Sequence, residues 1–200
     1  VINTPPEENK ILKLAYKLNC PPVIANLLLQ RDIDTAEKAQ AFFYPSLNML
    51  HDPFLMKDMD KAVDRLDKAI AQEEKILIYG DYDVDGTTAV ALLYKYLKNK
   101  CNATNLEYYI PDRYTEGYGV SIKGIDYAAE NDFSLILVTD CGVKAVEKVR
   151  YAKEKGVDII ICDHHTPGDS LPEAVAVLDP QRQDCDYPYK WLSGCGVSFK

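Results

Sequence analysis

Acidic and histidine side chains recur at the ends of apolar segments in the second half of the chain. Asp81, Asp83 and Asp85 alternate directly after the apolar run at 76–79. Alternating residues of an extended chain point the same way, so the side chains of Asp81 and Asp83 are expected to converge. Carboxylates crowd together at low cost only where a cation neutralises them. The run therefore predicts a site for divalent cations rather than acidic loop residues that face water.

Two further polar clusters follow apolar, strand-like segments. Asp140 ends one such run, and Asp163, His164 and His165 follow another. A single acid at a strand end is a weak signal, but two adjacent histidines beside an acid favour the binding of a metal or a phosphate. Imidazole and carboxylate ligands together suit Mn²⁺, and oxygen ligands also suit Mg²⁺.

The acidic run also matches sites of other classes. The Asp-x-Asp-x-Asp-Gly spacing is that of the first half of an EF-hand calcium loop, but that loop needs a Glu where this chain has Leu92. A phosphatase of the haloacid dehalogenase type carries Thr or Val where this chain has Asp85, and it has no need of two histidines. The chain has no glycine-rich nucleotide-binding sequence and no serine nucleophile elbow.

Alternating strands and helices must position these side chains. From residue 76 onward, the hydrophobic pattern predicts strands at 76–79, 106–110, 135–139, 157–162 and 174–178, with helices at 87–99, 122–131 and 143–155. This order predicts an α/β fold, with a mostly parallel sheet that has helices on both faces and right-handed crossovers. Ligands of such sheets bind beyond the carboxyl ends of the strands, where the acids and histidines lie.

Residues 1–75 have a different pattern, which predicts a helical amino-terminal extension before the catalytic core at 76–200. In the amphipathic segment at 58–73, the apolar residues Ala62, Leu66, Ala69 and Ile70 recur on one face. Thr35 is the expected N-cap of an earlier helix. The other helices of the extension are expected at 7–18, 23–31 and 35–43, before a proline-rich stretch at 45–53.

Composition restricts the class of protein. The 200 residues are 47% hydrophobic, which allows a sizeable core, and the six cysteines form no C-x-x-C pair. These features, together with the lack of a membrane-length apolar run or a secretory signal, predict a cytoplasmic protein with reduced thiols and no membrane partner. The net charge of −8 argues only weakly against a nucleic-acid partner. Cations bound by the carboxylates would restore positive charge where a phosphate must lie.

The chemistry-bearing segments resemble the DHH phosphoesterase superfamily and, within it, the RecJ-type exonucleases specific for single-stranded DNA. The segments at 80–86, 138–142 and 162–165 are similar to three successive motifs of that family, and 192–200 is similar to its glycine-rich segment. The segment at 110–120 resembles a signature of the exonucleases.

Two other features fit the exonuclease branch. The residues at 45–47 and 52–54 are similar to its amino-terminal extension. Leu77 stands where the pyrophosphatases and small phosphoesterases of the superfamily carry a His.

The resemblance implies a metal-dependent phosphodiesterase that degrades single-stranded DNA from the 5′ end to mononucleotides, in DNA repair and recombination. It implies a site for two Mn²⁺ or Mg²⁺ ions. Asp81 and Asp83 would each hold one ion, Asp140 would bridge them, and His164 would complete the second. His165 is expected to face the scissile phosphate.

Other residues take supporting roles in this interpretation. Asp163 is expected to orient the two histidines from outside the ligand set. Asp85 is either a ligand or a residue that forms the turn. Arg113 is a candidate for the phosphate at the 5′ end, with an exposed loop arginine as an equal alternative. Tyr114 and Tyr118 could stack on bases or serve as packing residues.

The family's site is completed by a further Asp beyond the glycine-rich segment. Because this chain stops at Lys200, we expect a catalytic core truncated at its carboxyl end and weak or absent activity by itself. Single-stranded DNA is the expected partner of a monomer, and replication or repair proteins are further candidates. Two other functions stay open: a hydrolase of pyrophosphate or very short oligonucleotides, and a non-catalytic module that binds nucleic acid or a replication complex.

Overall fold

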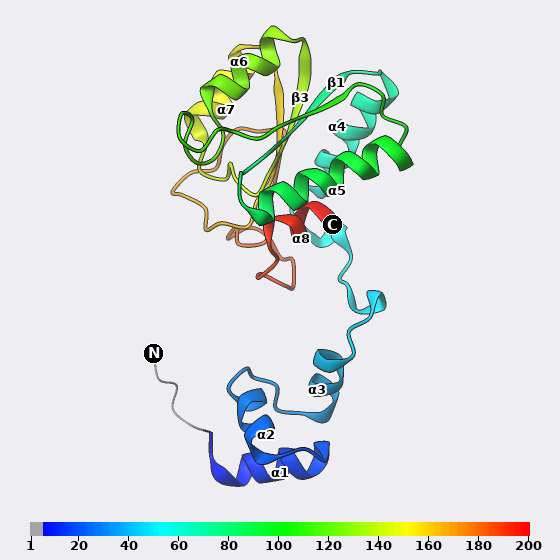
Figure 1. The fold of residues 1–200 in the computed structure, drawn as a ribbon, viewed down its shortest axis with the longest axis vertical. Coiled ribbons are helices and arrows are strands. Elements are labelled where there is room, and N and C mark those ends of the chain that lie inside the picture. The colour runs from blue at the N-terminus through cyan, green and yellow to red at the C-terminus, as the bar shows by residue number, and fades with distance from the viewer. Residues whose placement is uncertain (1–5) are drawn as a thin grey trace. The chain divides into compact units, whose positions relative to one another are not determined.

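The computed structural model describes residues 6–200, which form two compact units that meet between Leu50 and His51 in the sequence. Figure 1 labels the helices and strands along the chain. In the first unit they are α1 (Glu8–Leu18), α2 (Pro22–Leu29), α3 (Ala36–Phe43) and the 3-10 turn η1 (Leu47–Met49). In the second unit they are η2 (Pro53–Leu55), α4 (Met59–Ala71), β1 (Lys75–Gly80), α5 (Val84–Lys100), β2 (Leu106–Tyr109), α6 (Ile122–Glu130), β3 (Phe133–Thr139), α7 (Val146–Glu154), β4 (Asp158–Cys162), β5 (Ala176–Leu178) and α8 (Gly194–Phe199).

The first unit is a small helical cluster. Leu14 of α1, Leu28 of α2 and Ala39 of α3 are buried together in its core. Thr35 caps α3, as expected, because its hydroxyl oxygen accepts a hydrogen bond from the backbone N–H of Lys38 at 3.2 Å. Such a cap satisfies one of the backbone donors that a helix start leaves without a partner.

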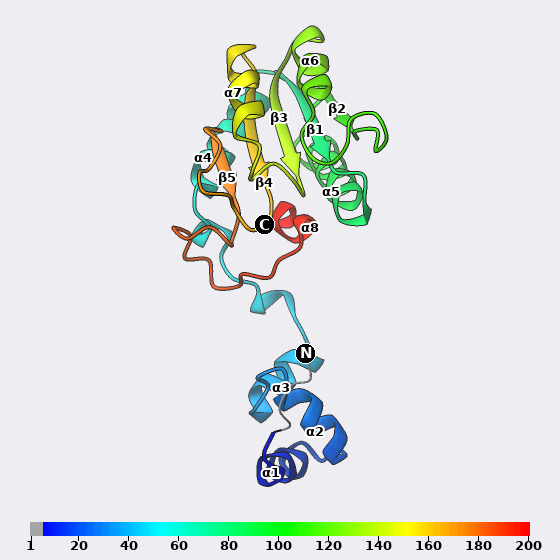
Figure 2. The ribbon, with the colours of Figure 1, turned by 90° about the vertical axis from the view of Figure 1, so that its left-hand side faces the viewer.

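The second unit contains a five-stranded sheet in the order β2-β1-β3-β4-β5. Every pair of neighbouring strands is parallel, and Figure 2 shows the strands running side by side. The α/β fold with a parallel sheet is therefore confirmed. The three strands β1, β3 and β4 are buried along nearly their whole length, as expected of a parallel sheet that is covered on both faces, whereas the edge strand β2 is mostly exposed.

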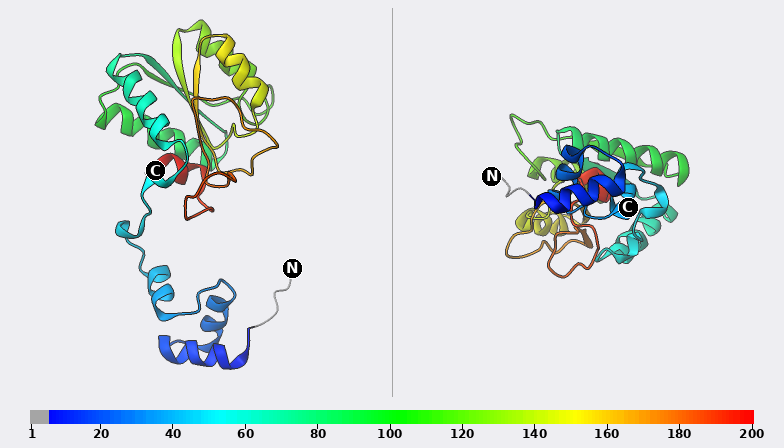
Figure 3. Two further views of the ribbon diagram at one scale, coloured as in Figure 1. Left: turned by 180° about the vertical axis from the view of Figure 1, so that it is seen from behind. Right: turned by 90° about the horizontal axis from the view of Figure 1, so that it is seen from below.

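Helices cover both faces of this sheet (Figure 3). On one face Ile78, Leu137 and Ile160 pack with α4, α5 and α8. On the other face Tyr79 and Val138 pack with α6 and α7. Successive residues of the central strands therefore enter opposite cores, which explains why β1, β3 and β4 are mostly apolar instead of alternating with polar residues.

Helix α4 lies in the second unit, although the sequence analysis assigned it to the extension. Its predicted apolar face is confirmed, because Ala62 and Ala69 are buried while Leu66 and Ile70 are half-buried against the same core. This contact explains why the compact unit begins at His51 and not at residue 76. The functional division of the chain at residue 76 stays a prediction.

Two general features complete the fold. All six cysteines are free thiols. Cys141 and Cys162 are buried near the carboxyl ends of β3 and β4. Among the described residues, none of the helices combines the length and the apolar character that a membrane crossing requires.

Candidate metal centre

The chain changes direction between β1 and β3, two neighbouring strands in the middle of the sheet. After β1 the chain passes through α5 to β2 on one side, and after β3 it passes through α7 to β4 on the other. The two connections diverge at the carboxyl ends of these strands, which is where doubly wound folds bind ligands. Asp81 and Asp140 follow these two strands directly, so the predicted site residues lie at this position.

Asp81 lies directly after β1, and its side chain is buried. The backbone groups of Tyr82, Gly119 and Asp83 near its carboxylate favour the charged form. Burial outweighs these groups and raises the pKa of Asp81 above its usual value, and the nearby Asp83 carboxylate adds to the rise. One carboxylate oxygen, Oδ1, is buried without any hydrogen-bond partner.

Asp83 reaches the same point from the start of α5. It is the N-cap of that helix, and its Oδ1 accepts a hydrogen bond from the backbone N–H of Gly86 at 3.0 Å. The cap explains why α5 begins at Val84, three residues before the predicted start. Carboxylate oxygens of Asp81, Asp83 and Asp140 lie within 4.8 Å of one another, so the expected convergence is found.

Asp140 occupies the centre of the site. Its backbone has a left-handed conformation, with φ of 59°, which is rare for residues other than Gly and which recurs at functional sites. The side chain is buried, at 3% exposed, and burial raises the pKa of Asp140 to about 8, with further contributions from the carboxylates of Asp85 and Asp83. Its Oδ1 has no hydrogen bond and lies 3.1 Å from Nε2 of His164.

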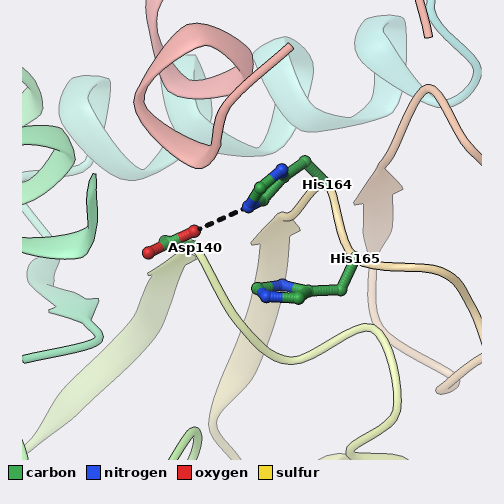
Figure 4. A group of neighbouring side chains, drawn as sticks. All are labelled: Asp140, His164 and His165. Carbon is green, nitrogen blue, oxygen red and sulfur yellow. Dashed lines mark ion pairs between the residues drawn. The ribbon is translucent and has the colours of Figure 1, made fainter. Parts of the chain in front are cut away.

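The two histidines extend from the end of β4 towards Asp140 (Figure 4). Asp163 is buried beneath them, and its Oδ1 accepts hydrogen bonds from the backbone N–H of His164 at 2.7 Å and of His165 at 3.2 Å. The same oxygen lies 2.7 Å from Nδ1 of His165, while Oδ2 accepts from the backbone N–H of Val143 at 2.8 Å. A carboxylate at Nδ1 favours the tautomer with the ring proton there, which leaves a lone pair on Nε2.

Asp85 connects the site to α8. Its two carboxylate oxygens accept hydrogen bonds from the backbone N–H groups of Gly194 at 2.7 Å and Cys195 at 2.8 Å. Partial burial opposes ionisation, but these donors outweigh it and hold the pKa of Asp85 below its usual value. Its Oδ2 lies 3.7 Å from Nε2 of His164. The occupied oxygens favour a supporting role over a ligand role.

The glycine-rich segment approaches Asp140 so closely that only a glycine fits at its first helical position. A Cβ atom on Gly194 would lie 2.6 Å from the Cβ of Asp140 and closer still to its Oδ1. Such distances are well inside van der Waals contact. The start of α8 is therefore one wall of the metal centre.

The loop at 110–121 covers the other side of the site. The Tyr118 hydroxyl donates a hydrogen bond to the backbone oxygen of Asp140 at 3.3 Å, and it lies 3.2 Å from Nε2 of His165. Arg113 is exposed and lies outside the acidic cluster, with its guanidinium carbon 5.2 Å from the centre of the Tyr82 ring. Its role in binding a phosphate stays a prediction. Tyr114 is 93% exposed.

Two buried groups hold this loop on the sheet. The hydroxyl of Tyr79 donates to the backbone oxygen of Gly119 at 2.9 Å and accepts from the backbone N–H of Ser121 at 3.1 Å. The carboxylate of Glu116 accepts from the hydroxyls of Tyr109 at 2.8 Å and Ser121 at 2.7 Å. Both groups fix the loop that carries Tyr118 at the edge of the metal centre before any substrate arrives.

One acid near the site was not singled out from the sequence. Asp179 directly follows β5 and is fully buried, and burial raises its pKa to about 7. Its Oδ1 accepts a hydrogen bond from the backbone N–H of Gln181, whose side-chain amide donates to the backbone oxygen of His164. An acid at a strand end was the same signal that pointed to Asp140, so it was available in the sequence.

The donor set fits divalent cations. Two groups of side chains can each hold an ion, Asp81 with Asp83 and Asp140, and Asp140 with His164 and His165. Asp140 belongs to both groups, which is the placement that a bridging ligand requires. Buried carboxylate oxygens without hydrogen-bond donors, on Asp81 and Asp140, are costly unless a cation lies beside them. Whether His165 is a ligand or faces the substrate stays a prediction.

Comparison with known proteins agrees with this geometry. The family model for the DHH family, N-terminal domain, matches residues 75–200. The chain is 43% identical over 195 residues to the single-stranded-DNA-specific exonuclease RecJ of Bacillus subtilis, and it is 32% identical over 179 residues to that of Escherichia coli. These matches cover 98% and 90% of this chain, but only 25% and 30% of the two relatives.

Solved structures of RecJ are also similar to this chain. A crystal structure of exonuclease RecJ bound to manganese is 33% identical, with a TM-score of 0.66, over 75% of this chain and 37% of the other. The RecJ of Thermus thermophilus in complex with Mn²⁺ is 26% identical, with a TM-score of 0.74, over 98% of this chain and 27% of the other. The family match, the parallel sheet and the acids and histidines at three strand ends together show that this chain belongs to the DHH family.

Proposed function

We propose that this chain carries most of the metal-binding residues of a nuclease that hydrolyses phosphodiester bonds in single-stranded DNA from the 5′ end, in DNA repair and recombination. One observation carries the proposal. Asp81, Asp83, Asp140 and His164 converge at the switch point of the sheet, and the buried oxygens of two of these carboxylates have no hydrogen-bond donor. The similarity to the RecJ exonucleases supports the choice of substrate.

Two Mn²⁺ or Mg²⁺ ions would fit this donor set, and Asp81, Asp83, Asp140 and His164 would hold them. Such ions polarise a phosphate and lower the pKa of an attacking water. The ions also explain how a chain of net charge −8 can attract a polyanion, because they reverse the charge at the one point where phosphate must lie.

The side chains around the ions do the positioning. Asp163 holds the His165 ring by its Nδ1 at 2.7 Å, so Nε2 is directed to where a phosphate oxygen would lie. Tyr118 restrains the same ring from the opposite side, since its hydroxyl is 3.2 Å from Nε2. Asp85 binds the start of α8 and so maintains the wall next to Asp140. A rigid arrangement of this kind lowers the cost of orienting the substrate.

The proposal is tested by comparing substrates with the intact protein that carries this chain. With Mn²⁺ present, we expect turnover of long single-stranded DNA that carries a 5′ phosphate. We expect at least about tenfold lower kcat/KM, a difference of about 1.4 kcal/mol, on duplex DNA, on dinucleotides and on pyrophosphate. Release of mononucleotides from a 5′-end-labelled strand reports the direction of degradation. Faster turnover of pyrophosphate or dinucleotides would assign the site to a small-substrate phosphoesterase, and no metal-dependent turnover would favour a binding module.

A further inference from the structure

A pocket of about 280 Å³ lies beside the metal centre, between the loop that carries Tyr118 and the segment that leads from Gly142 into α7. None of the residues assigned to the metal ions lines it. Tyr118 contacts both the pocket and the metal centre. It lines the pocket, and its hydroxyl contacts the backbone oxygen of Asp140 and the ring of His165. The pocket therefore begins where the metal centre ends.

Two lysines give this pocket a positive charge. Lys144 and Lys148 line it, and within residues 6–200 neither takes part in an ion pair. Glu147 also lines the pocket, but its carboxylate is paired with Arg150 at 2.8 Å. In a chain of net charge −8, two lysines without acidic partners next to a proposed phosphate site are suited to bind an anion.

The start of α7 adds backbone donors to the same pocket. Ala145, the N-cap residue, has no side chain that bonds to the helix, and α7 begins at Val146. The first backbone N–H groups of the helix therefore have no acceptor within α7, and they carry the positive end of its dipole. A phosphate oxygen is a favourable acceptor at such a position.

The rest of the pocket is mostly apolar. Val120 is buried in its wall, and Val146 and the ring of Tyr118 complete the surface. An exposed aromatic ring beside cations is the combination that single-stranded nucleic-acid sites use to stack bases and hold the backbone. The volume of about 280 Å³ is just below the range of about 300–1,000 Å³ for small-molecule sites, which limits the pocket to about one nucleotide.

We propose that this pocket binds one nucleotide of a single-stranded nucleic acid, adjacent to the phosphate at the metal centre. Tyr118 and Val146 contact its base or sugar, and Lys144 and Lys148 contact its own phosphate. This inference rests on the proposed function, because it assumes a polynucleotide substrate that extends beyond the bond to be broken. It differs from that function in naming a second contact region, supplied by α7 and independent of the metal ligands.

Protection of lysines from acetylation tests occupancy of the pocket directly. The intact protein with Asp140→Asn, in Mn²⁺ at a concentration that saturates the variant, is treated with an amine-reactive acetylating reagent, alone and with an octathymidylate, and the modified lysines are quantified by mass spectrometry. We expect several-fold protection of Lys144 and Lys148. Lys153 at the other end of α7 is the matched control and should be modified equally with and without the octathymidylate. No protection, or equal protection by inorganic phosphate alone, overturns the nucleotide assignment.

A kinetic comparison tests whether the pocket serves the reaction. The double variant Lys144→Gln/Lys148→Gln is compared with Lys153→Gln on an oligonucleotide and on bis(p-nitrophenyl) phosphate, a small phosphodiester too short to span both places. We expect the double variant to raise KM for the oligonucleotide about tenfold more than KM for the small diester. The double variant should also bind DNA with a weaker salt dependence, because two charges that contact phosphates are removed. The slope of the logarithm of the DNA-binding constant against the logarithm of the salt concentration should fall in magnitude by about one to two.

The two hypotheses fail in different ways. A wild-type protein that hydrolyses neither substrate contradicts the proposed nuclease function, while the acetylation experiment still decides whether the pocket holds a nucleotide. A wild-type protein that hydrolyses the oligonucleotide, with the same KM and salt slope in the double variant as in Lys153→Gln, contradicts the pocket and leaves the nuclease function standing.

Discussion

At the scale of single residues, the site depends on buried carboxylates. Burial of a charged carboxylate is unfavourable unless a partner neutralises the charge. Asp140 is the extreme case, since it combines a left-handed backbone, burial and a pKa raised to about 8 by that burial and by neighbouring acids. Strain and unfavourable burial persist only where something else compensates for them. A divalent cation is the compensation that this donor set indicates.

The variant Asp140→Asn tests that residue. We expect it to weaken Mn²⁺ binding at least about a hundredfold, because the amide has no charge and donates hydrogen bonds into the cluster. Isothermal titration calorimetry measures the affinity, and circular dichroism checks the fold. Asp179→Asn, an equally buried acid outside both ligand groups, is the control and should bind Mn²⁺ nearly as well as the wild type. Unchanged Mn²⁺ affinity in Asp140→Asn would remove Asp140 from the site.

At the scale of elements, α8 and the end of β3 fit together as one unit. The absence of a side chain at Gly194 allows the helix to approach Asp140, and Asp85 fixes that approach through two backbone hydrogen bonds. The helix therefore determines where the Asp140 carboxylate can point. Three elements far apart in the sequence thus share the positioning of one ligand.

Gly194→Ala tests this arrangement. The added methyl group has no room, so we expect a loss of about 1–3 kcal/mol in the free energy of unfolding, together with at least about tenfold weaker Mn²⁺ binding as Asp140 is displaced. Gly196→Ala in the same helix is the matched control, because its added Cβ would meet nothing closer than 3.5 Å. Chemical denaturation and calorimetry give the two quantities. Equal behaviour of the two variants would show that α8 does not position Asp140.

These elements also show how far the sequence alone reaches. The five strands were predicted to within two residues of their observed ends, because a buried parallel sheet leaves continuous apolar runs. The predicted start of α7 at residue 143 was wrong: Gly142, with φ of 107°, opens a turn in which the backbone N–H of Ala145 bonds to the oxygen of Gly142, and the helix follows at Val146.

The contacts of the site were less accessible to sequence reasoning. The convergence of Asp81, Asp83 and Asp140 could be predicted, because ligand-binding residues of a parallel sheet lie at the carboxyl ends of its strands. The partner of Asp85 lies more than 100 residues away in sequence, at Gly194, and no local pattern encodes such a contact. Tyr118 meets His165 for a similar reason, since the loop that carries it is placed by tertiary contacts and not by its own pattern.

At the scale of the whole molecule, a rise in pH should destabilise the metal-free protein, whereas a bound metal ion should stabilise it. The raised pKa of Asp140 means that the metal-free folded protein holds a proton that the unfolded chain would release. Its contribution to stability is complete below the unfolded pKa near 3.8 and is lost as the pH rises through about 8. A metal ion replaces that proton, so the ion should stabilise the protein more strongly at high pH.

Thermal unfolding measures both effects. We expect the metal-free protein to lose stability between about pH 5 and pH 8, after correction for other groups by comparison with Asp140→Asn. Mn²⁺ at one fixed concentration, about 100 times its dissociation constant at pH 8, should add about 2.7 kcal/mol at about pH 8 and less at about pH 6, where the proton on Asp140 weakens metal binding. A rise in Tm that is the same at both pH values, or the same in Asp140→Asn, would contradict metal binding at this cluster.

The acidic cluster at the switch point also sets the order in which ligands can assemble. On the proposed function, the carboxylates without cations would repel single-stranded DNA and with cations would attract it, so the binding of DNA and the binding of metal would be coupled. Linkage is reciprocal: the factor by which metal increases the affinity for DNA is the factor by which DNA increases the affinity for metal. The protein should therefore retain its ions most firmly while a strand is engaged and exchange them most readily between strands.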